Sequence, residues 1–322
     1  MSDNLLDKHR TFMAAMIHLQ SRVGNKQIKR FLRDNHLPES LSEQLTSIYQ
    51  PLAEFIIRSG QRLNHRVIGI NGSQGSGKST LCRVLEWLLN QQGKRVATLS
   101  IDDLYLTEVR RIELAEQVHP LLRTRGVPGT HDVALGIRTL QTLQNGNPIA
   151  LPRFNKAEDN PYPRHQWPAQ TQSADFILFE GWCVASRPQS EADLREPINR
   201  LEAEEDHRGH WRRYVNDQLA GPYQTLFDPI DLLILLEVAD FSWVYDWRKK
   251  QEDQLRQRQA GSRIMDDHMI ARFIQHFERI TRHNGQTLPR YADIRLILHR
   301  SQRIEKYVLA RPHLGSLMHD LA

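Results

Sequence analysis

The stretch that decides the fold of this chain is Gly72-Ser73-Gln74-Gly75-Ser76-Gly77-Lys78-Ser79-Thr80. Residues 66–71 before it, Arg-Val-Ile-Gly-Ile-Asn, predict a short buried strand. In residues 80–91, which follow it, leucines and a valine recur at helical spacing. A strand, a glycine-rich turn and a helix in this order, with the pattern G-x-x-x-x-G-K-[ST], are typical of a phosphate-binding loop.

Each residue type in this loop has a physical reason for binding phosphate. Glycines let the backbone wrap so that its N–H groups point at phosphate oxygens, and the helix that follows adds its partial positive charge. We expect Lys78 to reach the β- and γ-phosphates of ATP and the Ser79 hydroxyl to ligate Mg²⁺. The expected nucleotide-binding residues are Gly72, Ser73, Gln74, Gly75, Ser76, Gly77, Lys78, Ser79 and Thr80.

Composition excludes several classes of protein. The chain has 322 residues, 39% of them hydrophobic, which is enough for a sizeable core. Its apolar run 232–236 is too short to span a membrane, and its first residues carry no signal-peptide pattern. Cys82 and Cys183 form no disulfide framework. A net charge of +5 without a basic run favours small anionic ligands over nucleic acid. We therefore expect a cytoplasmic protein without a nucleic-acid or membrane partner.

The chain divides into a helical extension, residues 1–60, and a larger domain, residues 61–322. Apolar residues recur at helical spacing in two parts of the extension, and nothing there suggests chemistry. The two sets are Leu5, His9, Phe12, Met13 and Met16, and then Leu41, Leu45, Ile48, Leu52, Phe55 and Ile56.

Short apolar strands alternate with helical patterns through the larger domain. The expected strands are residues 67–71, 95–101, 175–180, 231–237 and 293–298. Strands buried on both faces and separated by helices imply an α/β fold, a doubly wound and mainly parallel sheet with helices on both faces. Ligands of such sheets lie at the carboxyl ends of the strands, so the residues that follow each strand are candidates for function.

Carboxylates follow two of these strands. Asp102 and Asp103 end the second strand, where one of them can accept the proton of an attacking hydroxyl group; we favour Asp102. The alternative is that one of the pair caps the next helix. Glu180 ends the third strand, where a carboxylate near Mg²⁺ is expected in nucleotide sites. We therefore name Ser79, Glu180 and Asp102 as the candidate Mg²⁺ ligands.

A basic segment follows the fourth strand. Most of its charges are expected to face solvent, and Arg248 is our candidate for a residue that closes over the triphosphate. Trp243 and Trp247, at positions i and i+4, are expected to anchor that helical turn. Its other basic residues are Lys249, Lys250, Arg256, Arg258 and Arg263.

The loops between the second and third strands are rich in Pro, Gly and basic residues, as functional loops often are. Arg125, Arg153 and Lys156 are candidates for holding an anionic substrate, since a guanidinium fork binds both oxygens of a carboxylate. His131 is another candidate, although His131-Asp132 can equally start the helix at Val133. Asp103 and Tyr105 complete the expected substrate-binding set.

A GTPase shares the phosphate loop and has to be weighed. Residues 155–158, Asn-Lys-Ala-Glu, approach the Asn-Lys-x-Asp pattern that specifies guanine, but the fourth residue is Glu and Pro152 disrupts a strand before it. The third strand ends in Glu-Gly-Trp rather than in the Asp-x-x-Gly of GTPases. These mismatches disfavour a GTPase or metallochaperone.

Several segments resemble the P-loop small-molecule kinases related to uridine kinase, phosphoribulokinase and bacterial pantothenate kinase. Residues 100–105, Ser-Ile-Asp-Asp-Leu-Tyr, resemble their second-strand motif, 125–132 their Arg-Gly-x-Pro segment, and 179–182 their Glu-Gly strand end. The chain is most similar to the plant-type D-glycerate 3-kinase family. That resemblance also rests on residues 202–206, 211–216 and 244–248, and the chain departs from it at Leu104, where Phe is more usual.

The resemblance implies an ATP- and Mg²⁺-dependent kinase whose base is Asp102 and whose acceptor is the 3-hydroxyl group of D-glycerate. The residues alone imply phosphoryl transfer to a small anionic hydroxy acid, with Lys78, Asp102, Glu180 and Arg248 as catalytic groups. A nucleoside kinase or a pantothenate-like kinase is an alternative acceptor class. A nucleotide-dependent switch or a DNA-associated ATPase is an alternative outside kinases.

Overall fold

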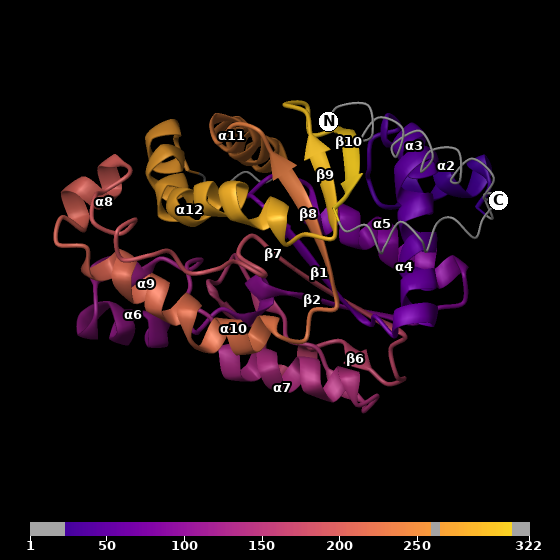
Figure 1. Ribbon diagram of the computed structural model, residues 1–322, viewed down its shortest axis with the longest axis horizontal. Helices are drawn as coiled ribbons and strands as arrows, with labels where there is room; N and C mark the ends of the chain where they lie inside the picture. The colour runs from indigo at the N-terminus through magenta and orange to yellow at the C-terminus, as the bar shows by residue number, and fades with distance from the viewer. Residues whose placement is uncertain (1–22, 259–264, 311–322) are drawn as a thin grey trace.

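A computed structural model describes residues 23–258 and 265–310 of the chain, and Figure 1 shows its arrangement. A six-stranded sheet with the order β10-β9-β8-β1-β7-β2 runs through the centre. All neighbouring strands are parallel except β10, which pairs antiparallel with β9. The strands of this sheet are β1 (Val67–Gly72), β2 (Val96–Ser100), β7 (Phe176–Gly181), β8 (Leu232–Val238), β9 (Ile294–Leu298) and β10 (Ile304–Leu309).

Successive side chains of a strand point to opposite faces of the sheet, so the hydrophobic core is divided into one cluster on each face. On one face, Ile68, Ile70 and Leu178 pack with apolar residues of α2 to α5. On the other face, Ile177 and Phe179 pack with α7, α9, α10 and α12. These helices are α2 (Asn25–Asp34), α3 (Leu41–Gln44), α4 (Gln50–Leu63), α5 (Lys78–Gln91), α7 (Val133–Gln144), α9 (His210–Ala220), α10 (Pro222–Phe227) and α12 (Asp267–Thr287).

Two further helices and two small two-stranded sheets, one of which is the β4–β5 hairpin, complete the part of the chain that positions the site. Helix α6 (Glu108–Gln117) follows the end of β2, and α11 (Ser242–Arg258) follows β8. Between α7 and β7 lie the paired strands β3 (Ile149–Ala150) and β6 (Ala169–Gln170), and β4 (Phe154–Asn155) and β5 (Asn160–Pro161). Helix α8 (Arg200–Glu205) lies between β7 and α9.

The expected α/β fold with a mainly parallel sheet and helices on both faces is confirmed. All five expected strands form, each within a residue or two of its expected ends, and the helix after the phosphate loop begins at Lys78. Strand β10 and the two small two-stranded sheets were not anticipated. None of the helices among residues 23–258 and 265–310 combines the length and apolar character that a membrane crossing needs.

The helices α2 to α4 belong to the expected helical extension. Helical character at 41–56 is confirmed, and these helices share one hydrophobic cluster with the sheet. The helical pattern expected from Leu5 to Met16 falls outside the described residues. The boundary between residues 60 and 61 as a domain division stays a prediction.

Candidate active site

The phosphate loop has the backbone that its glycines predict. It runs from the end of β1 to the first turn of α5, with positive φ angles of 75° at Gly75 and 95° at Gly77. A Cβ atom at Gly72 would lie 2.6 Å from Ser76 Oγ, and one at Gly75 would lie 2.6 Å from the Cβ of Trp247. Only glycine therefore fits at Gly72 and Gly75 without moving a neighbour.

Polar groups of the loop remain without partners inside the protein. Lys78 Nζ donates to the backbone carbonyl of Ser73 at 3.0 Å and so folds over the loop. Ser73 Oγ, Gln74 Oε1 and Ser76 Oγ are buried and have no hydrogen-bond partner among the residues that the structure describes. Buried polar atoms are normally paired, and the phosphate chain of a nucleotide with its waters would supply partners here. The residues of the loop therefore fit the phosphates of a nucleoside triphosphate.

Glu180 and Ser79 lie together beside the loop. Strand β7 pairs with both β1 and β2, which brings Glu180 opposite Ile70 and Ser100. The Ser79 hydroxyl donates to Glu180 Oε1 at 3.0 Å. A hydroxyl and a carboxylate are oxygen donors of the kind that Mg²⁺ prefers, and Mg²⁺ usually completes its shell with phosphates and water. In the described part of the chain, no group of three or more His, Cys, Asp or Glu side chains could hold a metal alone.

Asp102 lies at the end of β2, in the 3₁₀ turn Ile101–Leu104. Its Oδ1 accepts a hydrogen bond from Tyr105 Oη at 2.7 Å, and its Oδ2 accepts one from Lys156 Nζ at 2.6 Å. Burial tends to raise the pKa of the Asp102 carboxyl, but the Lys156 ammonium and the Tyr105 hydroxyl outweigh it and hold that pKa well below its usual range. Asp102 is therefore an ionised carboxylate that can accept a hydrogen bond from a substrate.

Asp103 has a different set of partners. Its carboxylate accepts from the backbone N–H of Phe154 at 3.1 Å and from Arg153 Nη1 at 3.2 Å. Burial raises its pKa to about 6, against the opposing effect of Arg153. The cap of the next helix, α6, is Thr107, so neither aspartate takes the capping role considered above. Asp103 instead holds the β4–β5 hairpin against the end of β2.

The cations expected around the substrate lie close to the two aspartates, and each already has an anionic partner. Arg153 pairs with Asp103, Lys156 with Asp102, and Arg125 with Asp159 of the same hairpin. Asp102 raises the pKa of Lys156 most strongly among its surroundings, while Arg125 opposes that shift. The structure thus gathers Arg125, Arg153 and Lys156 at one site as charge-balanced pairs.

Of the two roles considered for His131-Asp132, the structure shows the helix start, and a substrate-binding role for His131 stays a prediction. Asp132 caps α7, since its Oδ1 accepts from the backbone N–H of Leu135 at 2.8 Å. His131 is buried and stacks on Tyr105 with ring centroids 4.7 Å apart, while its Nδ1 lies 2.6 Å from Tyr223 Oη. The start of the helix thus explains Asp132, and the packing beside Tyr105 places His131 next to the aspartates.

Helix α11 packs over the phosphate loop through Trp247. This side chain is buried, faces Gly75 and donates from Nε1 to the carbonyl of Arg300 at 2.7 Å. The expected anchoring of this turn is confirmed for Trp247, and Trp243 packs beside it. The helix includes Arg256, whose side chain lies outside the described residues, as does that of Arg258; Arg263 is not described at all.

Arg248, one residue further along α11, is turned toward the site. Its guanidinium pairs with Glu252 and lies 5.4 Å from the ring centroid of Phe273. Burial lowers its pKa against the opposing charge of Glu252, and Arg125 lowers that pKa further while Asp102 raises it. Its Nε atom is buried without a hydrogen-bond partner among the described residues. An arginine with a free N–H group, one residue after the tryptophan that packs on the loop, is a candidate for binding a phosphate oxygen.

Sequence reasoning missed Asp159, Arg111, Tyr223 and Gln302. Asp159 pairs with Arg125 and with the buried Arg111. Gln302, in the β9–β10 turn, donates to the carbonyl of Gly75 at 2.6 Å. No motif marks these residues, since each acts through a partner far away in the sequence. The sequence did not indicate that Arg111 is buried, because an arginine in a polar helix is normally exposed.

A cavity of about 270 Å³ lies beside the phosphate loop, at the carboxyl ends of β1 and β8. From β1 the chain continues toward β2, and from β8 toward β9, on opposite sides of this point in the sheet. Ligands of open α/β sheets bind at such a switch point. Three of its lining residues, Ser73, Thr281 and Asn284, carry buried oxygen atoms without a hydrogen-bond partner in the described part of the chain. The crevice is therefore hollow and polar.

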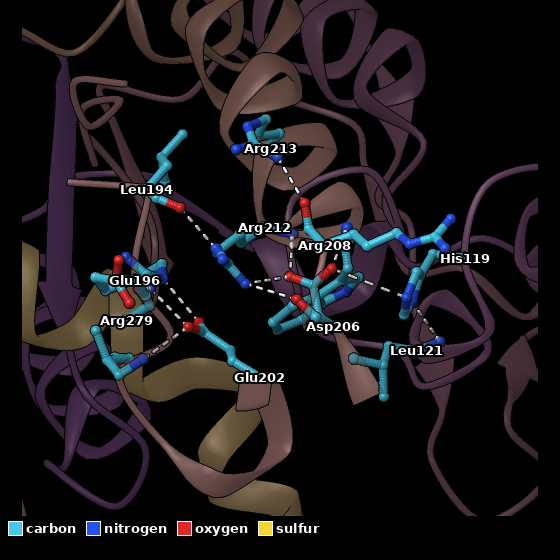
Figure 2. A network of polar contacts seen from close by, with 12 residues as sticks. His119, Leu121, Leu194, Glu196, Glu202, Asp206, Arg208, Arg212, Arg213 and Arg279 are labelled. Atoms are coloured by element: carbon cyan, nitrogen blue, oxygen red, sulfur yellow. Dashed lines mark hydrogen bonds and ion pairs between the residues drawn. The ribbon is translucent and has the colours of Figure 1, made fainter. Parts of the chain in front are cut away.

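Segments 202–206 and 211–216, which carry part of the resemblance described above, contribute Glu202, Asp206 and Arg212 to a buried polar network (Figure 2). Glu202 pairs with Arg279 at 2.6 Å, and Asp206 pairs with Arg212 at 3.0 Å. The two arginines also donate to the carbonyls of residues 193–196. This network fixes the loop after β7, which gives these segments a structural role.

Comparisons with known proteins find similarity to a GTPase family in the part of the chain around the phosphate loop, and to kinases over a larger part of the chain. The family described as "Methylmalonyl Co-A mutase-associated GTPase MeaB" matches residues 39–105, a part that contains the phosphate loop and stops before the hairpin. The chain is 33% identical over 226 residues to "Uncharacterized kinase mug58" of Schizosaccharomyces pombe, covering 66% of this chain and 78% of that protein. It is 31% identical over 231 residues to the chloroplastic D-glycerate 3-kinase of Arabidopsis thaliana, covering 68% of this chain and 48% of that protein.

A solved structure shows the same fold. The D-glycerate 3-kinase from Cryptococcus neoformans var. grubii superimposes with a TM-score of 0.66, covering 81% of this chain and 99% of that one. The two sequences are 23% identical, so this likeness concerns the fold.

Proposed function

This chain belongs to the family of ATP-dependent P-loop small-molecule kinases that includes mug58 and D-glycerate 3-kinase, and we propose that it phosphorylates the 3-hydroxyl group of D-glycerate. The observation that carries the proposal is the 2.6 Å contact between Asp102 and Lys156 beside the phosphate loop. An acceptor that has both a hydroxyl group and a carboxylate can replace this contact with two of its own. The hydroxyl group binds Asp102, and the carboxylate binds Lys156.

In this proposal the nucleotide lies on residues 72–80. Lys78 turns from the carbonyl of Ser73 to the β- and γ-phosphates, where its charge offsets the negative charge of the transition state. Ser79 and Glu180 would hold Mg²⁺, with Asp102 as a further candidate ligand, and the ion would supply charge neutralisation at the phosphates. Arg248 donates to the transferred phosphoryl group from its free Nε–H group.

The transfer itself needs one proton acceptor. The 3-hydroxyl oxygen of the acceptor forms a bond to the γ-phosphorus, and the bond from that phosphorus to the β–γ bridging oxygen breaks. ADP leaves, and the hydroxyl proton passes to Asp102. Asp103 is assigned a structural role in this proposal, because its contacts with Arg153 and the backbone of Phe154 hold the β4–β5 hairpin against the end of β2.

Arg125, Arg153 and Lys156 favour an acid as the acceptor. A nucleoside has no carboxylate, so its binding would separate Lys156 from Asp102 without giving the ammonium a new anionic partner. A charged group left unpaired in a desolvated site costs binding free energy. The same reasoning applies less strongly to pantothenate, which has a carboxylate but is a much longer molecule.

The test is a screen of the purified chain with ATP and Mg²⁺ against D-glycerate, L-glycerate, pantothenate and uridine. Release of ADP is measured by a coupled assay, and the product is identified by ³¹P NMR. We expect 3-phosphoglycerate from D-glycerate. Phosphorylation of pantothenate or uridine, and not of D-glycerate, would refute D-glycerate as the acceptor but would still agree with kinase activity. ATP hydrolysis that is equal with and without every acceptor would favour a nucleotide-dependent switch.

A further inference from the structure

His131 is held by backbone contacts in the loop that faces the end of β2. Residues Tyr105 and His131 form an isolated antiparallel bridge, and the N–H group of Asp132 donates to the carbonyl of Leu104 at 2.6 Å. The ring stacks on Tyr105, whose hydroxyl binds Asp102. His131 is therefore one aromatic ring away from the base that we propose for the transfer.

The contacts of Tyr223 determine which nitrogen of His131 carries the proton. The Tyr223 hydroxyl oxygen accepts from the backbone N–H of Gly129 at 2.9 Å and lies 2.6 Å from His131 Nδ1. A backbone N–H group can only donate, so the hydroxyl proton is free to point at the histidine. The Tyr223 hydroxyl donates to His131 Nδ1 when Nδ1 is unprotonated, and a neutral ring with an unprotonated Nδ1 carries its proton on Nε2.

Burial supports a neutral ring. His131 is 4% exposed, and burial lowers its pKa to about 4, with Asp102 acting weakly in the opposite direction. The ring therefore holds a single proton at neutral pH. The contact with Tyr223 decides its position, because the alternative tautomer would leave the Tyr223 proton without an acceptor among these contacts.

The Nε2–H group that results has no partner. His131 Nε2 is buried and makes no hydrogen bond with any of the described residues. It lies on the edge of the ring away from Nδ1, and thus away from Tyr223. A buried donor without an acceptor is destabilising, so a site that keeps one is suited to a ligand that supplies the acceptor.

We propose that Tyr223 is a positioning residue that fixes His131 in the Nε2–H tautomer, so that His131 donates a hydrogen bond to an oxygen atom of the hydroxy-acid acceptor. This inference rests on the proposed function, since it places a ligand oxygen beside Asp102 and Tyr105. It adds to that function a selection rule: the acceptor must present an oxygen that accepts a hydrogen bond at this point. Tyr223 itself contacts no substrate.

The first arm of the test reads the tautomer directly and needs no activity. The full chain is labelled with ¹⁵N-histidine, and the His131 signals are identified by their loss in His131→Gln. In the wild-type chain we expect a protonated Nε2 and an unprotonated Nδ1, and in Tyr223→Phe a shift toward a mixture of tautomers. A protonated Nδ1 in the wild-type chain would overturn the proposal.

The second arm measures kinetics with whichever acceptor the screen identifies. Tyr223→Phe keeps the buried ring and removes only the hydroxyl group. We expect its KM for the acceptor to rise about 5- to 15-fold, as for one lost hydrogen bond, while its KM for ATP changes less than about twofold. Tyr49→Phe is the matched control, because Tyr49 is a buried tyrosine in the cluster on the opposite face of the sheet. It should leave both constants unchanged.

The two arms separate this inference from the choice of D-glycerate. If another hydroxy acid is the acceptor, the tautomer and the selective rise in KM are still expected with that acid. If Tyr223→Phe is folded, as judged by thermal unfolding, and leaves the acceptor KM at the wild-type value, the positioning role is refuted. Equal rises in KM for ATP and for the acceptor would refute it too, since they indicate a general disturbance of the loop.

Discussion

The charge of Glu202 should contribute far more to stability than that of Glu204, although the two residues lie on the same turn of α8. The perturbation is Glu→Gln at each position, which removes a charge and keeps the shape of the side chain. Glu202 is fully buried and its partner Arg279 is 7% exposed, whereas Glu204 and its partner Arg200 are 57% and 74% exposed. The two variants thus compare one chemical change in two environments.

The contacts of Glu202 give the expected magnitude (Figure 2). Its carboxylate accepts from Arg279 Nε at 2.7 Å, from Arg279 Nη2 at 2.6 Å and from the backbone N–H of Ile198 at 3.0 Å. Glu202→Gln leaves the Arg279 charge buried without an anionic partner. Breaking a buried ion pair in this way costs about 3–5 kcal/mol. An exposed pair such as Glu204–Arg200 contributes about 0–1 kcal/mol.

The assay is denaturant unfolding at pH 7, followed by circular dichroism, for the wild-type chain and both variants. A total stability of about 5–15 kcal/mol makes a loss of about 3 kcal/mol easy to detect. A Glu202→Gln variant within about 1 kcal/mol of Glu204→Gln would refute the reasoning. It would show that water or a rearranged loop replaces the carboxylate, and that the network does not hold the segment after β7 in place.

Four further changes test the site and the core. Lys78→Ala should lower turnover at saturating ATP by several kcal/mol of transition-state stabilisation while thermal unfolding stays near wild type; unchanged turnover would contradict the assignment of the phosphate loop. Asp102→Asn should keep nucleotide binding and lose about 10²–10⁴-fold in turnover, and a crippled Asp103→Asn beside an active Asp102→Asn would reverse the two roles. Arg248→Ala should lower kcat more than it weakens ATP binding, whereas a purely structural role would appear as a lower Tm with normal kinetics. Burial lowers the pKa of His276 to about 4, below an unfolded value of about 6.5, so the stability that the neutral ring contributes is lost as pH falls through that window. His276→Gln should therefore reduce the loss of unfolding free energy between pH 7 and pH 5 by about 2 kcal/mol. The same loss in the variant and in the wild-type chain would contradict this prediction.

The part of this protein that local sequence determines is the phosphate loop and the strands around it. Gly75 and Gly77 have positive φ angles, and a Cβ atom at Gly72 would meet Ser76 of the same loop, so these requirements are local and a short pattern is enough to predict the loop. The strands are continuous apolar runs because both faces of the sheet are covered, and their ends could be predicted to within a residue or two. That placed Asp102 and Glu180 at the correct edge of the sheet without any knowledge of tertiary contacts.

Tertiary structure alone decided which side chains meet at that edge. Asp103 binds a hairpin 50 residues further along the chain, His131 meets Tyr223 at a separation of 92 residues, and Gln302 reaches the phosphate loop across 227 residues. Sequence spacing fixes how far a side chain lies along its own strand or helix, because the local geometry repeats regularly. It carries no information on how a loop folds back over the sheet, since that depends on the packing of elements far apart in the chain. The different partners of Asp102 and Asp103 became visible only in the tertiary structure, and the role of each aspartate in the reaction stays a prediction.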